Sequence, residues 1–364
     1  MNNLPEGNAI IYCEGAFGNP NGKTAHGLVR RTERYNVLSV IDSKNAGKDA
    51  GLLLDDRQAG IPVHAGIRES FEYFKGKGQR PTHLVIGLAP DGGRVDNSVK
   101  DDVKEAIGLG LNIDSGLHDF FSEDEMILML AGEKGVRIRD VRKTPPRELL
   151  HFYSGKINEV KSFVIAVLGT DSAIGKRTTS WILKDALEKM SYRVELVGTG
   201  QTAWMQGVRY GIILDSLIND FVSGEIEHAV WQAWNENRPD VIIIEGQGSL
   251  MNPAYPGGFE IMAAGRPDII VLQHAPARKE YDGFPGYVIH PLSRQIQAIE
   301  LLSEKPVAAI TVNHEGLDKE TVPSVCEELW KDTGLPAFDI LLNGAGELAE
   351  VITSYISPSG GAGE

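Results

Sequence analysis

The sequence predicts an α/β protein of two domains, each built on a doubly wound parallel sheet. Three observations lead to this prediction. The chain has 364 residues, more than a single typical domain needs. Short apolar runs ending in Gly, Asp or Ala alternate with amphipathic stretches along both halves of the chain. Finally, a Gly-rich loop containing Gly175-Lys176 lies between an apolar run and a helix-like stretch, as phosphate-binding loops do.

Composition and charge exclude several classes of protein. The formal net charge of −14 and the lack of a Lys/Arg cluster argue against nucleic acid as a partner. No apolar stretch reaches the roughly 18 residues of a membrane span, and the N-terminus does not resemble a secretory signal. We therefore expect a cytoplasmic protein without a membrane partner. Cys13 and Cys326 stand alone, so we expect two buried thiols and neither a disulfide nor a metal site.

The first half contains four predicted strands, at residues 9–15, 36–42, 82–89 and 110–116. Gly-rich polar loops follow the first three of them: GAFGNPNGKTAHG, DSKNAGKDAG and APDGGR. In open parallel sheets, ligands bind at the loops that follow the carboxyl ends of strands. These loops lack the G-x-G-x-x-G spacing, so a dinucleotide site is only weakly supported.

The second half repeats the alternation of strand and helix, with predicted strands at residues 161–170, 192–200, 239–249, 267–276 and 305–313. Their continuous apolar character is typical of strands buried on both faces. Pro145-Pro146 and the charges around them indicate a connection between domains. We place the first domain at residues 1–152, the second at 153–356, and a flexible polar tail at 357–364.

The loop after the strand at 161–170 is the strongest functional signal in the chain. It runs GTDSAIGKRTT, with Gly169 and Gly175 five residues apart instead of the usual four, and Arg177 where a Mg²⁺-binding Ser or Thr is expected. Backbone amides at the start of a helix, together with Lys176, suit a phosphate. The alternative is a loop that only caps the helix, through Asp171 or Ser172. The predicted phosphate-binding residues are Gly169, Thr170, Asp171, Ser172, Gly175, Lys176, Arg177, Thr178 and Thr179.

Polar residues follow neighbouring predicted strands. Glu245 ends the apolar strand VIIIE, and Gln201 and Thr202 follow the strand at 192–200. Asp215 lies a short distance further along the chain. We expect these side chains at the same sheet edge as the phosphate loop, where a carboxylate serves as a general base or faces a metal-bound water. The alternative for Glu245 is a helix cap or an ion pair with an Arg.

Several of these stretches resemble known enzymes. GTDSAIGKRT and EGQGSLMNP are similar to the phosphate loop and a second Gly-rich segment of dethiobiotin synthetase. EGAFGNPNGKTAHGLVRR, IDSKNAGKDAG, APDGGR, SGLHDFFS and GTGQTAWMQG add a resemblance over most of the chain to the D-glutamate N-acetyltransferase family, formerly a bacterial domain of unknown function. The resemblance implies a Rossmann-like N-terminal domain, a P-loop NTPase-like C-terminal domain, and acetyl transfer from acetyl-CoA to the amine of D-glutamate.

The residue after the loop lysine bears on the cofactor. A loop that hydrolyses ATP needs a hydroxyl next to the lysine to hold Mg²⁺. Arg177 instead adds a second cation, which suits the diphosphate and 3′-phosphate of CoA. Thr178 or Thr179 would still reach a metal if the helix began one residue later. We therefore expect acetyl-CoA without a bound metal, and keep ATP with Mg²⁺ as the alternative.

Candidate substrate-binding residues follow the first and third predicted strands. Lys23, Arg30 and Arg94 are cations that can hold a carboxylate, and Gln201 and Thr202 are candidate polar contacts. His26 precedes Arg30 by about one helical turn and titrates near neutral pH. For attack of an amine on a thioester we expect a general base among Glu245, Asp215 and His26, in that order. The alternative for the loop with Lys23 and His26 is that it only packs against the second domain or binds a nucleotide. The alternative for Arg94 is a solvated turn.

Three functions compete at this point. The first is an N-acetyltransferase acting on D-glutamate or a similar amino diacid by direct attack, because no Ser-His-Asp or Cys-His arrangement can be recognised. The second is a Mg-ATP-dependent enzyme of the dethiobiotin synthetase type that phosphorylates or ligates a small carboxylate. The third is a non-catalytic nucleotide-binding regulator. Each binds a small molecule, and association into a homo-oligomer stays open.

Overall fold

The computed structural model describes residues 5–93 and 96–356, which divide into two compact units. The first unit contains the chain up to Pro145 together with Gln201–Val208, and the second contains Pro146–Gly200 and the chain from Arg209 onward. The boundary thus lies a few residues before the expected one at 152/153, because residues 151–157 pack against a helix of the second unit. The tail expected at 357–364 lies outside the described residues.

The first unit is a six-stranded, fully parallel sheet in the order β3-β2-β1-β4-β5-β6. This is the strand order of a Rossmann-like doubly wound fold. The strands are β1 (Gly7–Tyr12), β2 (Tyr35–Ile41), β3 (Val63–His64), β4 (His83–Ile86), β5 (Asn112–Ser115) and β6 (Ile138–Asp140). The helices are α1 (Lys23–Arg30), α2 (Ala50–Asp55), α3 (Ile67–Gly76), α4 (Asn97–Gly108), α5 (Glu125–Lys134) and α7 (Gln201–Met205).

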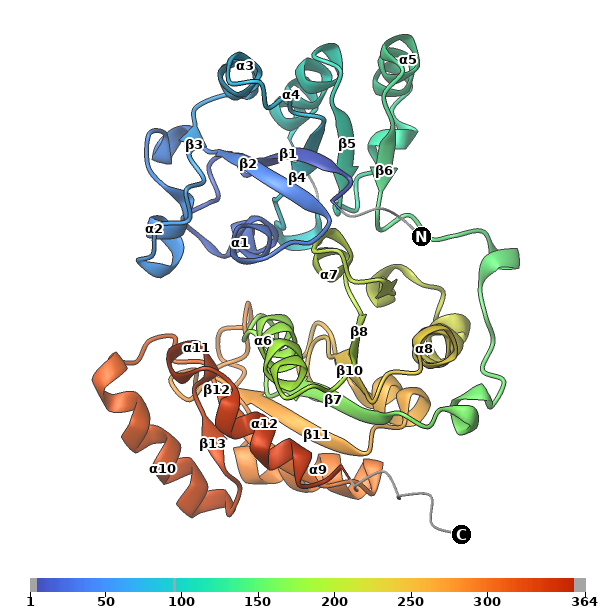
Figure 1. Ribbon diagram of the computed structural model, residues 1–364, viewed down its shortest axis with the longest axis vertical. Coiled ribbons are helices and arrows are strands. Elements are labelled where there is room, and N and C mark those ends of the chain that lie inside the picture. Colours follow the sequence, from blue (N-terminus) through green and yellow to red (C-terminus); the bar gives the residue numbers. More distant parts are fainter. Residues whose placement is uncertain (1–4, 94–95, 357–364) are drawn as a thin grey trace. The chain divides into compact units, whose positions relative to one another are not determined.

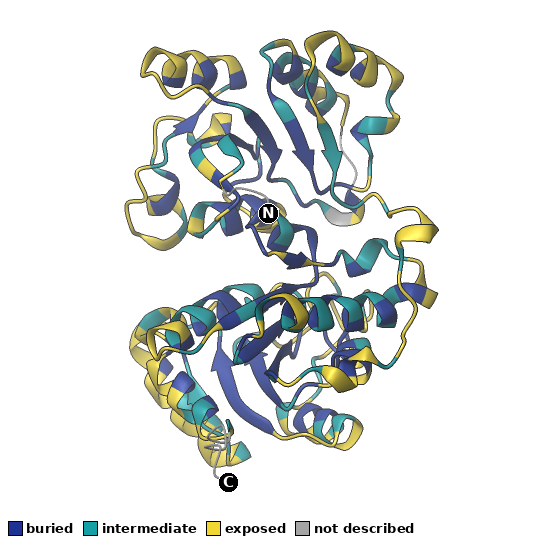
Figure 2. Ribbon diagram, turned by 45° about the vertical axis from the view of Figure 1, so that its right-hand side comes forward, coloured by how far each residue is buried: buried dark blue, intermediate teal, exposed yellow. Residues whose placement is uncertain are grey.

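Helices cover both faces of this sheet (Figure 1). Alternate residues along each strand point to opposite faces and pack against the helices on that side. Ile10, Tyr12 and Leu84 face the apolar stripes of α3, α4 and α5. Ala9, Ile11 and Val85 face the other side, where they pack with α1, α2 and Met205 of α7. The strands are therefore buried on both faces, as their continuous apolar sequence predicts (Figure 2).

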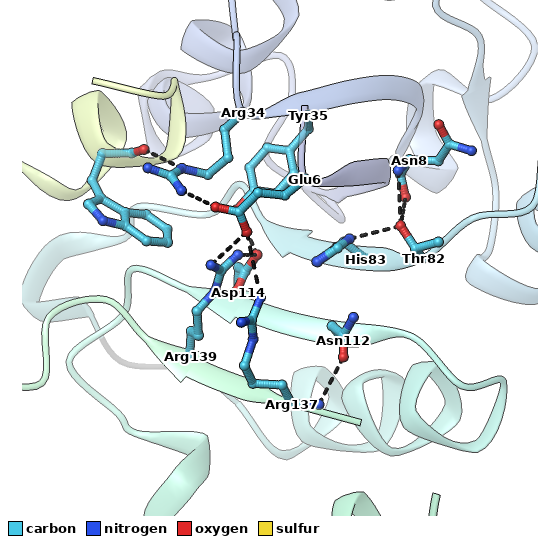
Figure 3. A network of polar contacts seen from close by, with 11 residues as sticks. Glu6, Asn8, Arg34, Tyr35, Thr82, His83, Asn112, Asp114, Arg137 and Arg139 are labelled. Atoms are coloured by element: carbon cyan, nitrogen blue, oxygen red, sulfur yellow. Dashed lines mark hydrogen bonds and ion pairs between the residues drawn. The ribbon is translucent and has the colours of Figure 1, made fainter. Parts of the chain in front are cut away.

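An ion-pair network ties the start of β1 to the outer strands β5 and β6 of the first unit (Figure 3). The Glu6 carboxylate pairs with Arg34 and, at 2.7 Å, with Arg139. Asp114 is fully buried and accepts hydrogen bonds from Arg139 and, at 2.6 Å, from the Tyr35 hydroxyl. Every buried charge here has an opposite partner, so the network is explained by structure without a ligand.

The second unit is a seven-stranded, fully parallel sheet in the order β13-β12-β11-β7-β10-β8-β9. Its strands are β7 (Phe163–Gly169), β8 (Val194–Gly198), β9 (Tyr210–Gly211), β10 (Val241–Glu245), β11 (Ile269–His274), β12 (Val307–Val312) and β13 (Ala337–Phe338). Its helices are α6 (Lys176–Lys189), α8 (Asn219–Asn237), α9 (Leu292–Ser303), α10 (Val322–Thr333), α11 (Ile340–Asn343) and α12 (Gly346–Thr353).

The central strand of this sheet is β7, which leads directly into the predicted phosphate loop and α6. Its neighbours β10 and β11 end at the same edge, so the loops after all three strands meet beside the start of α6. The fold class of two parallel α/β sheets is confirmed. Across residues 5–93 and 96–356, every helix is too short or too polar to cross a membrane.

Candidate functional site

The predicted phosphate loop forms a strand, turn and helix in the second unit. β7 ends at Gly169, and α6 begins at Lys176 after a turn in which Gly175 has a φ of 101°. Only glycine adopts such a φ readily, which explains its place in the motif. A Cβ on Gly169 would lie 2.9 Å from Cδ of Lys176, so this glycine leaves room for the lysine side chain. The first amides of α6 have no partner within the helix and are available to an anion.

Lys176 lies inside the loop. Its Nζ donates to the carbonyl oxygens of Asp171 at 2.7 Å and Gly248 at 2.8 Å. Burial lowers the pKa of Lys176 to about 8, while the nearby Asp171 and Glu245 carboxylates oppose this shift. The side chain is 6% exposed, and it is therefore a desolvated cation held ready for a negatively charged group.

Two buried oxygen atoms near Lys176 have no hydrogen-bond partner among the described residues. They are Oε2 of Glu245, which ends β10, and Oγ of Ser249 in the loop that follows. Burial raises the pKa of Glu245, although Arg177 and Lys176 oppose this shift. Buried polar atoms normally have partners. Both atoms are therefore able to accept a hydrogen bond from, or donate one to, a group at the loop.

Asp171 stabilises the conformation of the phosphate loop. Its fully buried carboxylate accepts hydrogen bonds from Asn252 Nδ2 and Arg278 Nη1, each at 2.9 Å. It also accepts the backbone amides of Ser172 and Asp282, so both oxygens are satisfied. The predicted phosphate contact of Asp171 is thus not through its carboxylate, which instead fixes the loop conformation.

The hydroxyl groups that follow Lys176 differ in their surroundings. Thr179 is buried and donates its hydroxyl to Gln273 of β11, so it faces the sheet. Thr178 is half-buried on the first turn of α6. Thr170 bonds to the ring of His274, and burial lowers the pKa of that ring to about 4, so it is neutral. Of the two threonines that follow Lys176, Thr178 is the one whose side chain is not buried against the sheet.

Asp215 lies between β9 and α8 in the same unit. Burial is the main cause that raises the pKa of Tyr255, and the nearby charges of Glu260 and Asp215 raise it further. Tyr255 lies in the loop after β10, where its carbonyl oxygen accepts a hydrogen bond from the amide of Ser249. The structure therefore brings Asp215, like Glu245, to the neighbourhood of the loop that follows β10.

The substrate-binding candidates of the first unit lie on α1. Nε2 of His26 contacts the carbonyl oxygen of Phe17 at 2.8 Å, and burial lowers the pKa of the His26 ring. Arg30 forms a two-pronged ion pair with Asp55 at 2.7 and 2.9 Å, so its guanidinium is already occupied. Lys23 is exposed at the start of the helix. Arg94 lies outside the described residues.

Gln201 and Thr202 lie in the first unit, whereas the phosphate loop lies in the second. They follow β8 as predicted, yet they open α7, which packs in the first unit. The Thr202 hydroxyl lies 2.9 Å from that of Thr24, and both side chains are buried. Sequence reasoning placed them at the sheet edge because nothing in the sequence shows that α7 leaves its own unit.

The Rossmann-like fold of the first unit implies a dinucleotide, but its residues do not fit one. The acidic residue at the end of β2 is Asp42, which in such folds holds a ribose. Here the buried carboxylate accepts the amides of Phe17 and Lys44 at 3.1 Å each. In addition, the Ala25 amide on the first turn of α1 donates to Gly87. The groups that would hold a dinucleotide are already used.

Sequence reasoning missed the residues that follow β11 and β12. Arg278 bonds Asp171, and the side-chain amide of Asn313 donates to the carbonyl oxygen of Ile174 at 3.0 Å. The next residue, His314, pairs with Asp339. Reading the polar residues after every predicted parallel strand, and not only after three of them, would have found Arg278, Asn313 and His314. It would not have found Asp339, which follows the unpredicted strand β13. In the described part of the chain, no three His, Cys, Asp or Glu side chains gather as metal ligands would.

Comparison with known proteins agrees with the two units. A family described as "Domain of unknown function (DUF1611_N) Rossmann-like domain" matches residues 43–144, and "Domain of unknown function (DUF1611_C) P-loop domain" matches residues 151–349. The crystal structure of a DUF1611 family protein from Anabaena variabilis is similar, with a TM-score of 0.87 and 28% identity over 96% of this chain and 100% of that one.

Two curated relatives carry the same name. A D-glutamate N-acetyltransferase from Pseudoalteromonas sp is 31% identical over 72% of this chain and 78% of its own length. Another from Tritonibacter scottomollicae is 28% identical over 81% of this chain and 88% of its own length. This agreement supports an acyltransferase enzyme and gives no support to a non-catalytic regulator. By fold, motif and similarity, the chain belongs to the DUF1611 family, with its Rossmann-like and P-loop domains.

Proposed function

We propose that this protein transfers an acetyl group from acetyl-CoA to the amine of D-glutamate or a similar amino diacid. The single observation that carries the proposal is the phosphate loop with its buried Lys176 and the two unpartnered oxygens beside it. The names of two relatives point to the same reaction. The residues fit a CoA phosphate group. They combine the first amides of α6, the cations of Lys176 and Arg177, and the Ser249 hydroxyl as a further donor.

The raised pKa of Glu245 is compatible with CoA in this loop. A protonated carboxyl group donates a hydrogen bond to a phosphate oxygen, whereas an ionised one would repel it. The thioester supplies an activated acyl carbon when acetyl-CoA is bound. The protein's own tasks are then to hold the phosphates, orient the amine and remove its proton. Backbone amides of the Gly-rich loops are candidates to stabilise the oxyanion.

The alternative is a Mg-ATP-dependent reaction of the dethiobiotin synthetase type. Glu245 favours it, because a carboxylate at the end of the strand next to the phosphate loop is suited to bind Mg²⁺ or its water. The accessible Thr178 hydroxyl also suits a metal. The two functions therefore differ in the ionisation of one side chain, Glu245, and in their need for metal.

The test combines activity and binding. Purified protein is incubated with acetyl-CoA and D-glutamate, L-glutamate or D-aspartate in the presence of EDTA, and N-acetylated products are measured by mass spectrometry. We expect N-acetyl-D-glutamate from the wild type. Lys176→Ala is expected to abolish CoA binding in calorimetry, whereas Lys189→Ala, an exposed lysine at the end of the same helix, retains it.

Glu245→Gln separates the two functions. Glutamine keeps a hydrogen-bond donor and loses the negative charge. A CoA site therefore retains its affinity for CoA, whereas a Mg-ATP site loses the Mg²⁺-dependent part of its affinity for ATP. Product formation only with Mg-ATP, or no binding of CoA by the wild type, would reject the acetyltransferase proposal.

A further inference from the structure

A histidine and a buried aspartate form a pair at the carboxyl edge of the second sheet. His314 follows β12 by two residues, and its Nδ1 lies 2.6 Å from Oδ2 of Asp339. Asp339 is fully buried, and its other oxygen, Oδ1, caps α11 by accepting the amides of Leu341 and Leu342. The helix cap therefore needs only one of the two carboxylate oxygens, and the second is left to orient the imidazole.

The loop that carries His314 is bonded directly to the phosphate loop. Asn313 donates its side-chain amide to the carbonyl oxygen of Ile174, within the turn before Lys176. On the other side of His314, Glu315 accepts Arg278 at 2.8 Å, and Arg278 in turn holds Asp171. These contacts lie within one unit, so the position of His314 relative to the phosphate loop is fixed by the fold.

The imidazole has the features of a general base. Because an ionised carboxylate only accepts hydrogen bonds, Nδ1 donates to Asp339 and the lone pair lies on Nε2. The His314 side chain is 22% exposed, and among the described residues its hydrogen bond to Asp339 uses Nδ1 and leaves Nε2 open. A base oriented by a buried carboxylate, with its other nitrogen open, is the arrangement that removes protons from nucleophiles in many enzymes.

The distance between the phosphate loop and this pair suits the length of CoA. The pantetheine arm is about as long as four extended residues, so its thioester reaches roughly 14 Å from the diphosphate. β12 lies two strands from β7, a separation of about 10 Å at the usual strand spacing. An extended arm held at the phosphate loop is therefore long enough to bring the thioester to the loop after β12, which carries His314.

We propose that His314 is the general base of acetyl transfer and that Asp339 is the residue that positions it. This inference rests on the proposed function. Nε2 of His314 takes one proton from the ammonium group of the amino diacid, and the freed amine attacks the acyl carbon. The new C–N bond forms as the C–S bond breaks, the second proton lost by nitrogen goes to the CoA thiolate, and His314 then releases its proton to water.

The test is a pH profile of kcat and KM for His314→Asn and Asp339→Asn in the full chain. Asparagine at 314 keeps a donor to Asp339 but has no basic nitrogen. We expect kcat to fall about 100-fold or more with little change in the KM for acetyl-CoA. We also expect wild-type activity to fall toward low pH and this fall to be absent in His314→Asn. Asparagine at 339 should lower kcat through the wrong imidazole tautomer.

Two neighbouring ionisable groups enter the experiment. They are Glu315, which is tied to Arg278, and Cys326 of α10, whose thiol has a pKa raised by burial and by Asp339. Cys326→Ala should therefore leave the low-pH limb in place. The matched control is His151→Asn, which removes another imidazole paired with a carboxylate, Glu225, on α8. It should retain wild-type kcat.

The outcomes separate the two proposals. Wild-type activity with an unchanged kcat and pH profile in His314→Asn would overturn the role of His314 and leave the acetyltransferase intact. Failure of the wild type to acetylate any of the three diacids would overturn the proposed function and this assignment together. If His314→Asn does not fold, as judged by its melting temperature, His314→Gln is measured in its place and judged by the same kcat and pH criteria.

Discussion

At the scale of single residues, the phosphate loop shows why residue type alone did not define the site. The sequence predicted Asp171, Lys176 and Thr179 all as phosphate-binding residues of one motif. In the structure Lys176 points into the loop, and Thr179 faces Gln273. The carboxylate of Asp171 already accepts hydrogen bonds from Arg278 and from backbone amides. Side-chain direction and the partners brought by distant loops made the difference, and neither is encoded in the spacing of the motif.

Lys176 makes anion binding dependent on pH. Its pKa is about 8 in the free protein, and a bound phosphate group will raise it. Below pH 8 the ammonium is already formed. Above pH 8 binding must take up a proton, so we expect affinity for CoA to fall toward tenfold per pH unit up to the pKa of the complex. Calorimetry from pH 7 to 9.5 measures this, and Lys176→Met should bind weakly without the slope. A pH-independent affinity in the wild type would contradict the assignment of Lys176.

Asp171 should be a stability residue as much as a site residue. Asp171→Ala leaves Arg278 and Asn252 without a buried partner, and breaking a buried ion pair of this kind costs about 3 kcal/mol or more. Urea denaturation measures the loss. The control is Glu327→Ala on α10, which removes an exposed pair with Lys331 and should change the free energy of unfolding by less than about 0.5 kcal/mol. Equal effects of the two substitutions would show that Asp171 is not an anchor.

At the scale of elements, the apolar runs of the sequence became strands close to where they were expected. The prediction succeeded at β1, β7 and β10 because their strands are long and buried on both faces. It missed β3, β6, β9 and β13, which have two or three residues each. Such short edge strands carry too few residues for a periodic pattern and exist because a neighbouring strand offers hydrogen bonds.

The segment 151–157 is held to α8 through a close backbone approach at Gly224. A Cβ on Gly224 would lie 1.9 Å from the carbonyl oxygen of His151. Gly224→Ala should therefore destabilise the protein by about 2 kcal/mol or more, although alanine is the better helix former. Gly132→Ala in α5, where nothing lies within 4 Å of the new atom, should instead stabilise it by up to about 1 kcal/mol. Thermal unfolding of both variants checks the opposite signs.

At the scale of the whole molecule, the segment 201–208 defines the architecture. The chain leaves β8 of the second unit, supplies α7 to the first unit, and returns at β9. Gln206 donates to the carbonyl oxygens of Gly27 and Arg31 at the end of α1. The Trp204 ring lies 3.8 Å from the Arg34 guanidinium. The first unit is thus completed by residues that the chain adds long after its own last strand.

Because residues 201–208 belong to the first unit and the chain on both sides of them to the second, the unfolding of the two units should be coupled. We expect a single transition for the wild type in calorimetry. Trp204→Ala removes the ring that packs on Arg34, at a cost of about 2 to 4 kcal/mol, and should separate an earlier transition of the first unit. Trp330→Ala, an exposed ring on α10, serves as the control and should leave one transition. Two transitions already in the wild type would refute the coupling.

The sequence by itself determined the fold class, the central strands and the phosphate loop. Those features depend on patterns within some ten or fifteen neighbouring residues, such as a continuous apolar run or a glycine that permits a positive φ. Only the tertiary structure decided that α7 belongs to the first unit, that Arg278 secures the loop, and that Asp339 meets His314. These are contacts between residues distant in sequence, set by strand order and by the burial of charge, and no local pattern of residues contains them.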